Sequence, residues 1–254
     1  MNEQDVNVIK QKYLDAITDL FAITFDIGIK CNGPLIIYGD TSSGKSSLVN
    51  CLKNIMLTNE LDCYLVNYRD TNSIKDIITE YRTKIDSLKS DFRKGNVTSM
   101  YSLEMIDLLN NIDEKTDLQL ENDSLKEFIP CILFIEDLHK YYTEDSSYNA
   151  YITDELIKLA HDGKDVGITF VFTTQNLDND DLFRLFESMD NKLILGNIPT
   201  SNTRNLDKYC IDKRIVRGRF VGVLSDIYND KYLINLNQIP DLYPTYFENF
   251  ESIY

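Results

Sequence analysis

The sequence is poor in the residue types that mark metal-binding, disulfide-bonded and nucleic-acid-binding proteins. Its 254 residues include two histidines, which leave little for metal chemistry, and five cysteines. The cysteines are odd in number and widely spaced, which favours free thiols in a reducing compartment over a disulfide framework or zinc knuckle. Basic residues number 26 against 41 acidic ones, giving a net charge of −15. Such a surface repels phosphate backbones, so nucleic acid is a disfavoured partner.

Long apolar runs are also missing. No segment reaches the roughly 20 apolar residues that a membrane-spanning helix needs. The N-terminal sequence MNEQDVNVIK lacks the charged-then-apolar order of a secretory signal, so we expect a soluble chain. At 43% hydrophobic residues, the chain can bury one large core or two small ones. We expect a single domain over 1–254, with a helical N-terminal segment (1–30) and a core (31–254).

Short apolar runs alternate with longer segments of helical periodicity, which is typical of a mostly parallel α/β sheet covered on both faces. Strands are predicted at 35–38, 63–67, 131–135, 168–173 and 192–195. Helices are predicted at 5–20, 46–57, 73–94, 99–111 and 148–161. The polar stretch 111–126 reads as a surface excursion. After Arg217, two strand-like runs around Asn229 and Asp230 predict a β-hairpin that closes the sheet edge.

Residues 39–46, GDTSSGKS, match the phosphate-binding pattern G-x-x-x-x-G-K-[ST] and stand between a predicted strand and a predicted helix. Glycines let the backbone wrap around phosphate oxygens, while the following helix presents free amides and the positive end of its dipole. Lys45 is expected to reach the β- and γ-phosphates and the Ser46 hydroxyl to bind Mg²⁺. The sequence thus predicts ATP and Mg²⁺ as cofactors; the alternative is a glycine-serine turn that matches by chance. The predicted nucleotide-binding residues are Gly39, Asp40, Thr41, Ser42, Ser43, Gly44, Lys45, Ser46 and Ser47.

An acidic pair follows the predicted strand 131–135, in the sequence CILFIEDLHKYY. This segment resembles a Walker B strand with its two acids in reversed order. In the usual order an Asp holds Mg²⁺ and a following Glu polarises the attacking water. Here Glu136 takes the metal side, together with Ser46, and Asp137 takes the water side. We therefore expect slow or absent hydrolysis; the alternative is that both acids begin a solvated loop.

Three segments, GDTSSGKS, GITFVFTTQ and RIVRGRF, resemble the FtsK/SpoIIIE family of motor ATPases. Within that superfamily the likeness is greatest to the C-terminal ATPase domain of EssC, of type VII secretion systems. Asp40 and Ser42 depart from the family's loop, and Asn176-Leu177 replaces its usual Arg-Pro. The resemblance implies a RecA-like, additional-strand P-loop NTPase, in which the strand after Walker B lies between the Walker A and Walker B strands. Gln175 at its tip would then sense the γ-phosphate; the alternative is a polar residue that begins a loop.

The resemblance also implies partners and a location. The chain would be an ATP-binding module for protein transport, one of several ATPase modules in a chain or ring, serving export of small WXG-type substrates. It would lie at the cytoplasmic face of the bacterial cell membrane, reaching the membrane only through a parent chain. The chain as given would be an excised domain or an unusually short homologue. DNA is an unlikely partner.

Ring ATPases often complete their site with an arginine from the next subunit. Arg217 and Arg219 flank Gly218 and are the candidates; the alternative is surface ion pairing. Two other functions stay open: a DNA-translocating or conjugation motor, and a catalytically decayed scaffold for protein recognition.

Overall fold

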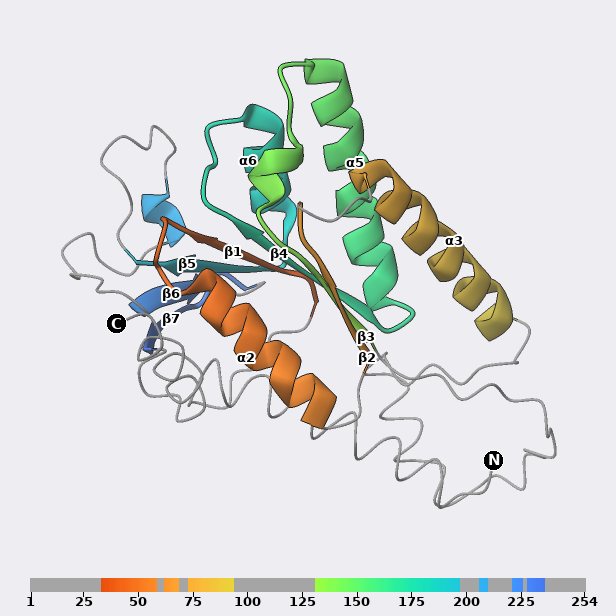
Figure 1. Ribbon diagram of the computed structural model, residues 1–254, viewed down its shortest axis with the longest axis horizontal. Coiled ribbons are helices and arrows are strands. Elements are labelled where there is room, and N and C mark those ends of the chain that lie inside the picture. Colours follow the sequence, from red (N-terminus) through yellow and green to blue (C-terminus); the bar gives the residue numbers. More distant parts are fainter. Residues whose placement is uncertain are drawn as a thin grey trace, which may run out of the picture.

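The computed structural model forms one sheet with helices on both faces (Figure 1). Helix α2 (Lys45–Thr58) covers one face, and α3 (Ile74–Arg93), α5 (Ser146–Lys164) and α6 (Asp180–Ser188) cover the other. The residues that the structure describes are 33–58, 62–68, 73–93, 131–196, 206–209, 221–225 and 228–235. This arrangement confirms the predicted α/β class.

The sheet has seven strands in the order β2-β3-β4-β1-β5-β6-β7. Strands β1 to β5 run parallel, and β5, β6 and β7 pair antiparallel. Their bounds are β1 (Leu35–Gly39), β2 (Asp62–Val66), β3 (Cys131–Ile135), β4 (Ile168–Thr174), β5 (Asn191–Leu195), β6 (Val221–Ser225) and β7 (Lys231–Asn235). The first five agree with the predicted strands to within one residue. Strand β4 lies between β1 and β3, as the family resemblance implies.

The continuous apolar runs of the central strands are explained by burial on both faces. Side chains alternate between the faces of a strand. In β3, Leu133 and Ile135 belong to a cluster of buried residues that extends into α3, α5 and α6. Ile132 and Phe134 are buried on the opposite face, which α2 covers. A central parallel strand therefore shows no polar alternation in its sequence.

The predicted helices at 46–57, 73–94 and 148–161 are confirmed as α2, α3 and α5. Helix α5 begins where the Asp145 side chain accepts hydrogen bonds from the backbone N–H groups of Ser147 and Tyr148. Helix α6 was not predicted; it begins at an Asn179 cap and is only 9 residues long. The 3₁₀ helices η2 (Leu138–Tyr141) and η3 (Asp207–Tyr209) were not predicted either.

The predicted C-terminal hairpin is confirmed. Strands β6 and β7 pair antiparallel with Ser225 opposite Lys231, and Asn229 in the connection has a φ of 63°. The hairpin extends the sheet beyond β5 and ends it at β7. The predicted helices 5–20 and 99–111 and the stretch 111–126 lie outside the described residues. Within the described ranges, no helix combines the length and apolar character that crossing a bilayer requires.

Gly163, in the last turn of α5, provides a test of this packing. A Cβ at this position would lie 2.6 Å from the carbonyl oxygen of Ile168 and 2.8 Å from a ring carbon of Phe170. Glycine to alanine inside a helix ordinarily stabilises by up to about 1 kcal/mol. Here overpacking reverses the sign, and we expect Gly163→Ala to lower the free energy of unfolding by about 1–3 kcal/mol in urea titrations.

Glu80→Ala is the control, because Glu80 lies exposed on α3. Its effect should stay within about 0.5 kcal/mol. A Gly163→Ala protein as stable as the wild type would contradict the close contact between the end of α5 and β4.

Candidate functional site

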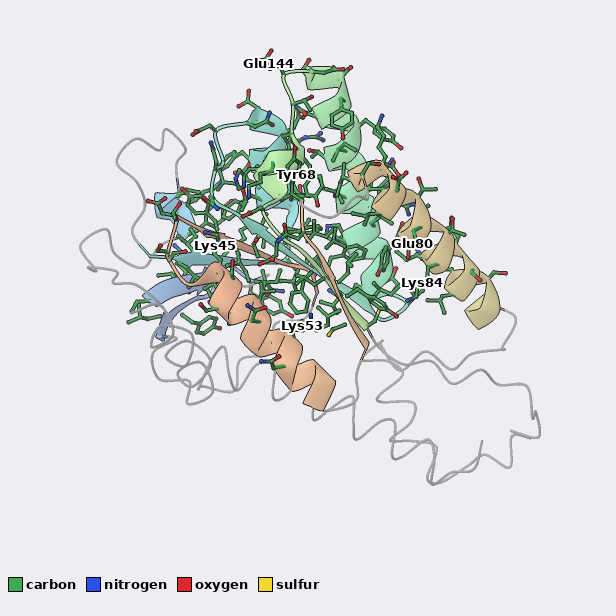
Figure 2. The ribbon with its side chains drawn as sticks, viewed as in Figure 1. Lys45, Lys53, Tyr68, Glu80, Lys84 and Glu144 are labelled. Carbon is green, nitrogen blue, oxygen red and sulfur yellow. The ribbon has the colours of Figure 1, made fainter. Side chains whose placement is uncertain are left out.

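The predicted site residues follow three neighbouring strands at their carboxyl ends. In the sheet order β3-β4-β1, the loop after β1 carries the phosphate-binding pattern, the turn after β3 carries the acidic pair, and Gln175 follows β4. Figure 2 shows Lys45 at the start of α2, beside these strand ends. In open α/β sheets this edge is where ligands bind.

The loop after β1 is shaped by close backbone approaches. A Cβ at Gly39 would lie 2.5 Å from the Ser43 Oγ and 2.7 Å from the Leu195 carbonyl oxygen, so no side chain fits there. Ser42 and Gly44 adopt φ angles of 64° and 106°, in the left-handed region that disfavours most side chains. The chain therefore curls back on itself before α2 begins.

Lys45 lies inside this curl, with 6% of its surface exposed. Its Nζ donates hydrogen bonds to the carbonyl oxygens of Gly39 and Asp40, the latter at 2.9 Å. Burial lowers the pKa of Lys45 to about 8, although the nearby carboxylates of Asp137, Asp40 and Glu136 act in the opposite direction. The loop thus holds one desolvated cation, which a ligand of high negative charge would stabilise.

One further feature of the loop fits phosphate oxygens. The first turn of α2, from Lys45 to Ser47, presents backbone N–H groups that have no intrahelical acceptor. The Ser43 Oγ, which is buried and makes no hydrogen bond, lies instead against the end of β1, 2.5 Å from where a Gly39 Cβ would be. Orphan amides and a buried ammonium meet at the same loop, so the residues present fit a triphosphate group.

Glu136 lies next to the start of α2. Its carboxylate accepts a hydrogen bond from Asn67 Nδ2 at 3.1 Å and is also hydrogen-bonded to Ser46. Burial is the main cause that raises the pKa of Glu136, and the neighbouring Asp137 adds to it. The structure therefore brings together the two predicted Mg²⁺ ligands, Ser46 and Glu136. A cation beside them would favour the ionised carboxylate.

A magnesium ion bound here would depend on the nucleotide. Among the described residues there is no group of three or more His, Cys, Asp or Glu side chains that could hold a metal ion. Mg²⁺ is commonly bound through one or two protein groups, with phosphate oxygens and waters completing its shell. The Ser46 and Glu136 pair fits that pattern.

Asp137 has a left-handed backbone, with φ 52° and ψ 43°. Its Oδ1 accepts a hydrogen bond from Gln175 Nε2 at 3.2 Å, and its Oδ2 forms an ion pair with Lys140. Burial alone would raise the pKa of Asp137, but the hydrogen bonds from Lys140 and Gln175 outweigh it and lower the pKa. The pKa values of the two adjacent acids are therefore shifted in opposite directions.

Gln175 links the loop to the acidic pair. Its Oε1 accepts a hydrogen bond from the Thr41 hydroxyl at 3.1 Å, while its Nε2 donates to Asp137. A continuous chain of side chains thus runs from Thr41 through Gln175 and Asp137 to Lys140. Gln175, the predicted sensor, thus contacts both the loop after β1 and the acidic pair.

Three residues at this edge were missed from the sequence. Asn67 binds Glu136, Lys140 pairs with Asp137, and His139 contacts the backbone of Gln175. Asn67 ends a predicted strand, but nothing in the pattern shows that this strand neighbours β3. His139 and Lys140 stand in the segment that carries the acidic pair, where the unforeseen helix η2 determines their directions.

The remaining predicted residues make fewer contacts at the site or lie outside the described part of the chain. Asp40 is exposed and accepts a hydrogen bond from the Thr41 backbone N–H at 2.7 Å. Ser47 lies half-buried in the first turn of α2. The candidate trans arginines, Arg217 and Arg219, lie outside the described residues.

Comparison with known proteins gives likenesses of structure alone. No protein-family model matches the sequence, and no curated protein matches it. Among solved structures, EssC (ATPases 2 and 3) from Geobacillus thermodenitrificans matches with a TM-score of 0.53 at 15% identity, over 80% of this chain and 39% of that chain. The cytoplasmic domain of the Thermomonospora curvata type VII secretion ATPase EccC gives 0.45 at 14%, over 80% and 23%.

A viral protein also matches. The genome packaging NTPase B204 from Sulfolobus turreted icosahedral virus 2, in complex with ATP-gammaS, gives a TM-score of 0.46 at 10% identity, over 80% of this chain and 97% of that chain. The chain spans less than half the length of the EssC and EccC chains that it matches. At such identities a likeness shows the fold and no more. The chain shares its mixed α/β fold with EssC (ATPases 2 and 3), as the sequence resemblance implies.

Proposed function

We propose that this chain is an ATP-binding module of an EssC-like, type VII secretion motor, with weak or regulated hydrolysis. One observation supports the nucleotide site above all others. Lys45, Glu136 and Gln175 follow three different strands and lie close together at the carboxyl ends of those strands. Adjacent ends of this kind are where a P-loop ATPase binds the phosphates and their metal.

The chain's own residues divide the work of binding. Lys45 would exchange its loop carbonyl partners for phosphate oxygens, which satisfies a buried ammonium better than neutral dipoles do. Ser46 and Glu136 would hold Mg²⁺, and Gln175 would donate a hydrogen bond toward the terminal phosphate. Bound ATP supplies a phosphoanhydride bond whose cleavage releases free energy for movement.

Weak hydrolysis follows from the position of Asp137. A general base works best when its pKa lies near the operating pH. The pKa of Asp137 is lowered, and its carboxylate is already engaged by Lys140 and Gln175. Its side chain is also one methylene shorter than the glutamate usual at this place. We propose that turnover needs a rearrangement of this pair, which a neighbouring ATPase module could provide.

The secretion role rests on the sequence resemblance and on the fold shared with EssC. The surplus of acidic residues agrees with a protein substrate, since a DNA motor needs basic side chains along its path. On this proposal the partners are further ATPase modules and small WXG-type substrates. The work takes place at the cytoplasmic face of the membrane, through a longer parent chain.

A decayed scaffold for protein recognition is the second candidate. Lys45 is satisfied by the carbonyl oxygens of its own loop, and Asp137 by Lys140. A site whose charged side chains already have partners within the protein could persist without turnover. This candidate and the motor differ in whether phosphate release depends on Lys45.

Replacing Lys45 tests the nucleotide site. Lys45→Ala removes the buried cation, and we expect affinity for ATP·Mg²⁺ to fall roughly 10- to 100-fold, the effect of losing a charge-assisted hydrogen bond. Lys53→Ala is the matched control, because Lys53 lies on the same helix α2, further from the loop (Figure 2). Isothermal titration calorimetry measures the affinity of each variant for ATP·Mg²⁺, and a separate assay measures phosphate release.

The outcomes separate the candidate functions. Binding with slow, Lys45-dependent phosphate release supports the motor. Binding without Lys45-dependent release favours the scaffold, and no binding by the wild type contradicts the nucleotide site altogether. Tight binding of double-stranded DNA at low salt would overturn the secretion role. Binding of a labelled C-terminal peptide from a WXG-type protein, but not of its scrambled sequence, would support it.

The lowered pKa of Lys45 predicts how affinity depends on pH. The free site holds Lys45 with a pKa of about 8, and a bound triphosphate favours the charged form and raises that pKa. Affinity for ATP·Mg²⁺ should therefore be maximal below pH 8 with respect to this group. Above pH 8 it should fall by up to about tenfold per pH unit, because binding must then take up a proton.

Calorimetry between pH 7.5 and 9.5, in buffers of different ionisation enthalpy, measures both the affinity and the proton uptake. The residual affinity of Lys45→Ala should lose this dependence. A wild-type affinity that stays constant to pH 9.5 would contradict the desolvation of Lys45.

A further inference from the structure

His139 lies in η2, two residues after the acidic pair, and is half-buried. Its Nδ1 is 3.4 Å from the backbone nitrogen of Gln175 and 3.5 Å from the Thr174 Oγ1. The Thr174 hydroxyl donates its proton to the Asn176 carbonyl oxygen at 2.8 Å. Nδ1 of His139 therefore accepts its hydrogen bond from the backbone N–H of Gln175.

The direction of this hydrogen bond determines the protonation of the ring. A backbone N–H can only donate, so Nδ1 must be unprotonated and the proton of the neutral ring must reside on Nε2. Burial is the largest cause that lowers the pKa of His139, and the cations Lys140 of η2 and Lys45 of α2 act the same way. Only Asp137 opposes them. The surroundings thus favour the neutral ring, and the contact with the Gln175 N–H assigns its proton to Nε2.

Both the side chain and the backbone of Gln175 are hydrogen-bonded. Thr41 and Asp137 bind its side-chain amide, and His139 binds its backbone N–H. The first two contacts would change when a phosphate group takes the place of a side-chain partner. The contact with His139 involves the main chain, so it can persist while the side chain of Gln175 exchanges partners.

We propose that His139 is a positioning residue that fixes the backbone of Gln175, so that the Gln175 side chain can distinguish a terminal γ-phosphate from its absence. This inference rests on the proposed nucleotide site. His139 does not itself touch the nucleotide. Its contribution is to preference for triphosphate over diphosphate, through the geometry of one main-chain amide.

The test compares two nucleotides in a set of full-chain variants. The Mg²⁺ complexes of a non-hydrolysable ATP analogue, AMPPNP, and of ADP are titrated by calorimetry, and the ratio of their affinities is the readout. In His139→Ala we expect this ratio to fall about fivefold, the effect of losing one hydrogen bond. Gln175→Ala should lower the ratio at least as much, and the double variant should fall no further than Gln175→Ala.

Two polar replacements separate positioning from mere packing. The side-chain oxygen of His139→Asn can take the place of Nδ1 as the acceptor, so this variant should retain at least half of the wild-type ratio. The amide of His139→Gln extends toward the place of Nε2, so this variant should behave like His139→Ala. Comparing these two also keeps the test valid if the alanine variant fails to fold.

A pH series gives a readout that packing would not move. Protonation of Nδ1 abolishes its role as an acceptor. Because burial holds the pKa of His139 below its ordinary value, the wild-type ratio should stay constant through neutral pH and fall only at acidic pH, below the usual imidazole range. In His139→Asn, titration of the nucleotide phosphates remains but this additional fall should be absent.

Failure of this inference is distinguishable from failure of the proposed function. A wild type that binds neither nucleotide overturns both. A wild type that prefers AMPPNP, with His139→Ala unchanged in the ratio, overturns this inference and leaves the nucleotide site intact. The same holds if the double variant shows the sum of both single losses, or if His139→Gln equals His139→Asn.

Discussion

The site depends on one steric constraint, the close passage of the end of β1 beneath its own loop. Gly39 has no space for a side chain because Ser43 and the carbonyl of Leu195 occupy it. Gly196, just past β5, is also close, since its Cβ would lie 3.2 Å from that of Ser43. Two glycines, one at the end of β1 and one just past the neighbouring β5, thus make room for Ser43. The loop can then curl tightly enough to enclose the ammonium of Lys45.

Electrostatic balance is the second requirement of this edge. A chain with a large surplus of acids places two lysines, Lys45 and Lys140, against the two adjacent acids Glu136 and Asp137. Both acids are partly buried and accept two side-chain hydrogen bonds, but one of those to Asp137 comes from the cation Lys140, so burial raises the pKa of Glu136 while hydrogen bonding lowers that of Asp137. Neighbouring carboxyls with opposite pKa shifts are suited to different roles. The side chain that a cation would ionise lies beside Ser46, and the one already ionised lies beside Gln175.

The sequence was informative where burial alone determines structure. The central strands read as continuous apolar runs, because a parallel sheet covered on both faces leaves no polar side, and their bounds followed to within a residue. Helix α6 was not predicted because it is short and begins with several acidic residues, so its sequence resembles that of a polar loop. The loop after β1 could be located from the sequence because its glycines stand where the chain passes close to neighbouring atoms or takes a left-handed conformation.

Contacts between strands could not be predicted in the same way. Asn67 reaches Glu136 only because β2 pairs with β3, and His139 reaches Gln175 only because β4 lies beside β3. Residue spacing does not encode the order of strands; the place of β4 came from a family resemblance. The contact of η2 with the end of β4 depends on a local turn that no sequence pattern marked. The roles proposed for Arg217 and Arg219 remain predictions.

The left-handed turn at Asp137 limits how this chain can change. Short side chains such as Asp and Asn tolerate that backbone better than longer ones, so the geometry of the main chain itself discriminates against glutamate there. Exchanging the two carboxylates to restore the common order would strain the polypeptide at the point where it leaves the sheet. A variant with a glutamate at this position should therefore bend differently after β3 or bear the strain of the left-handed conformation.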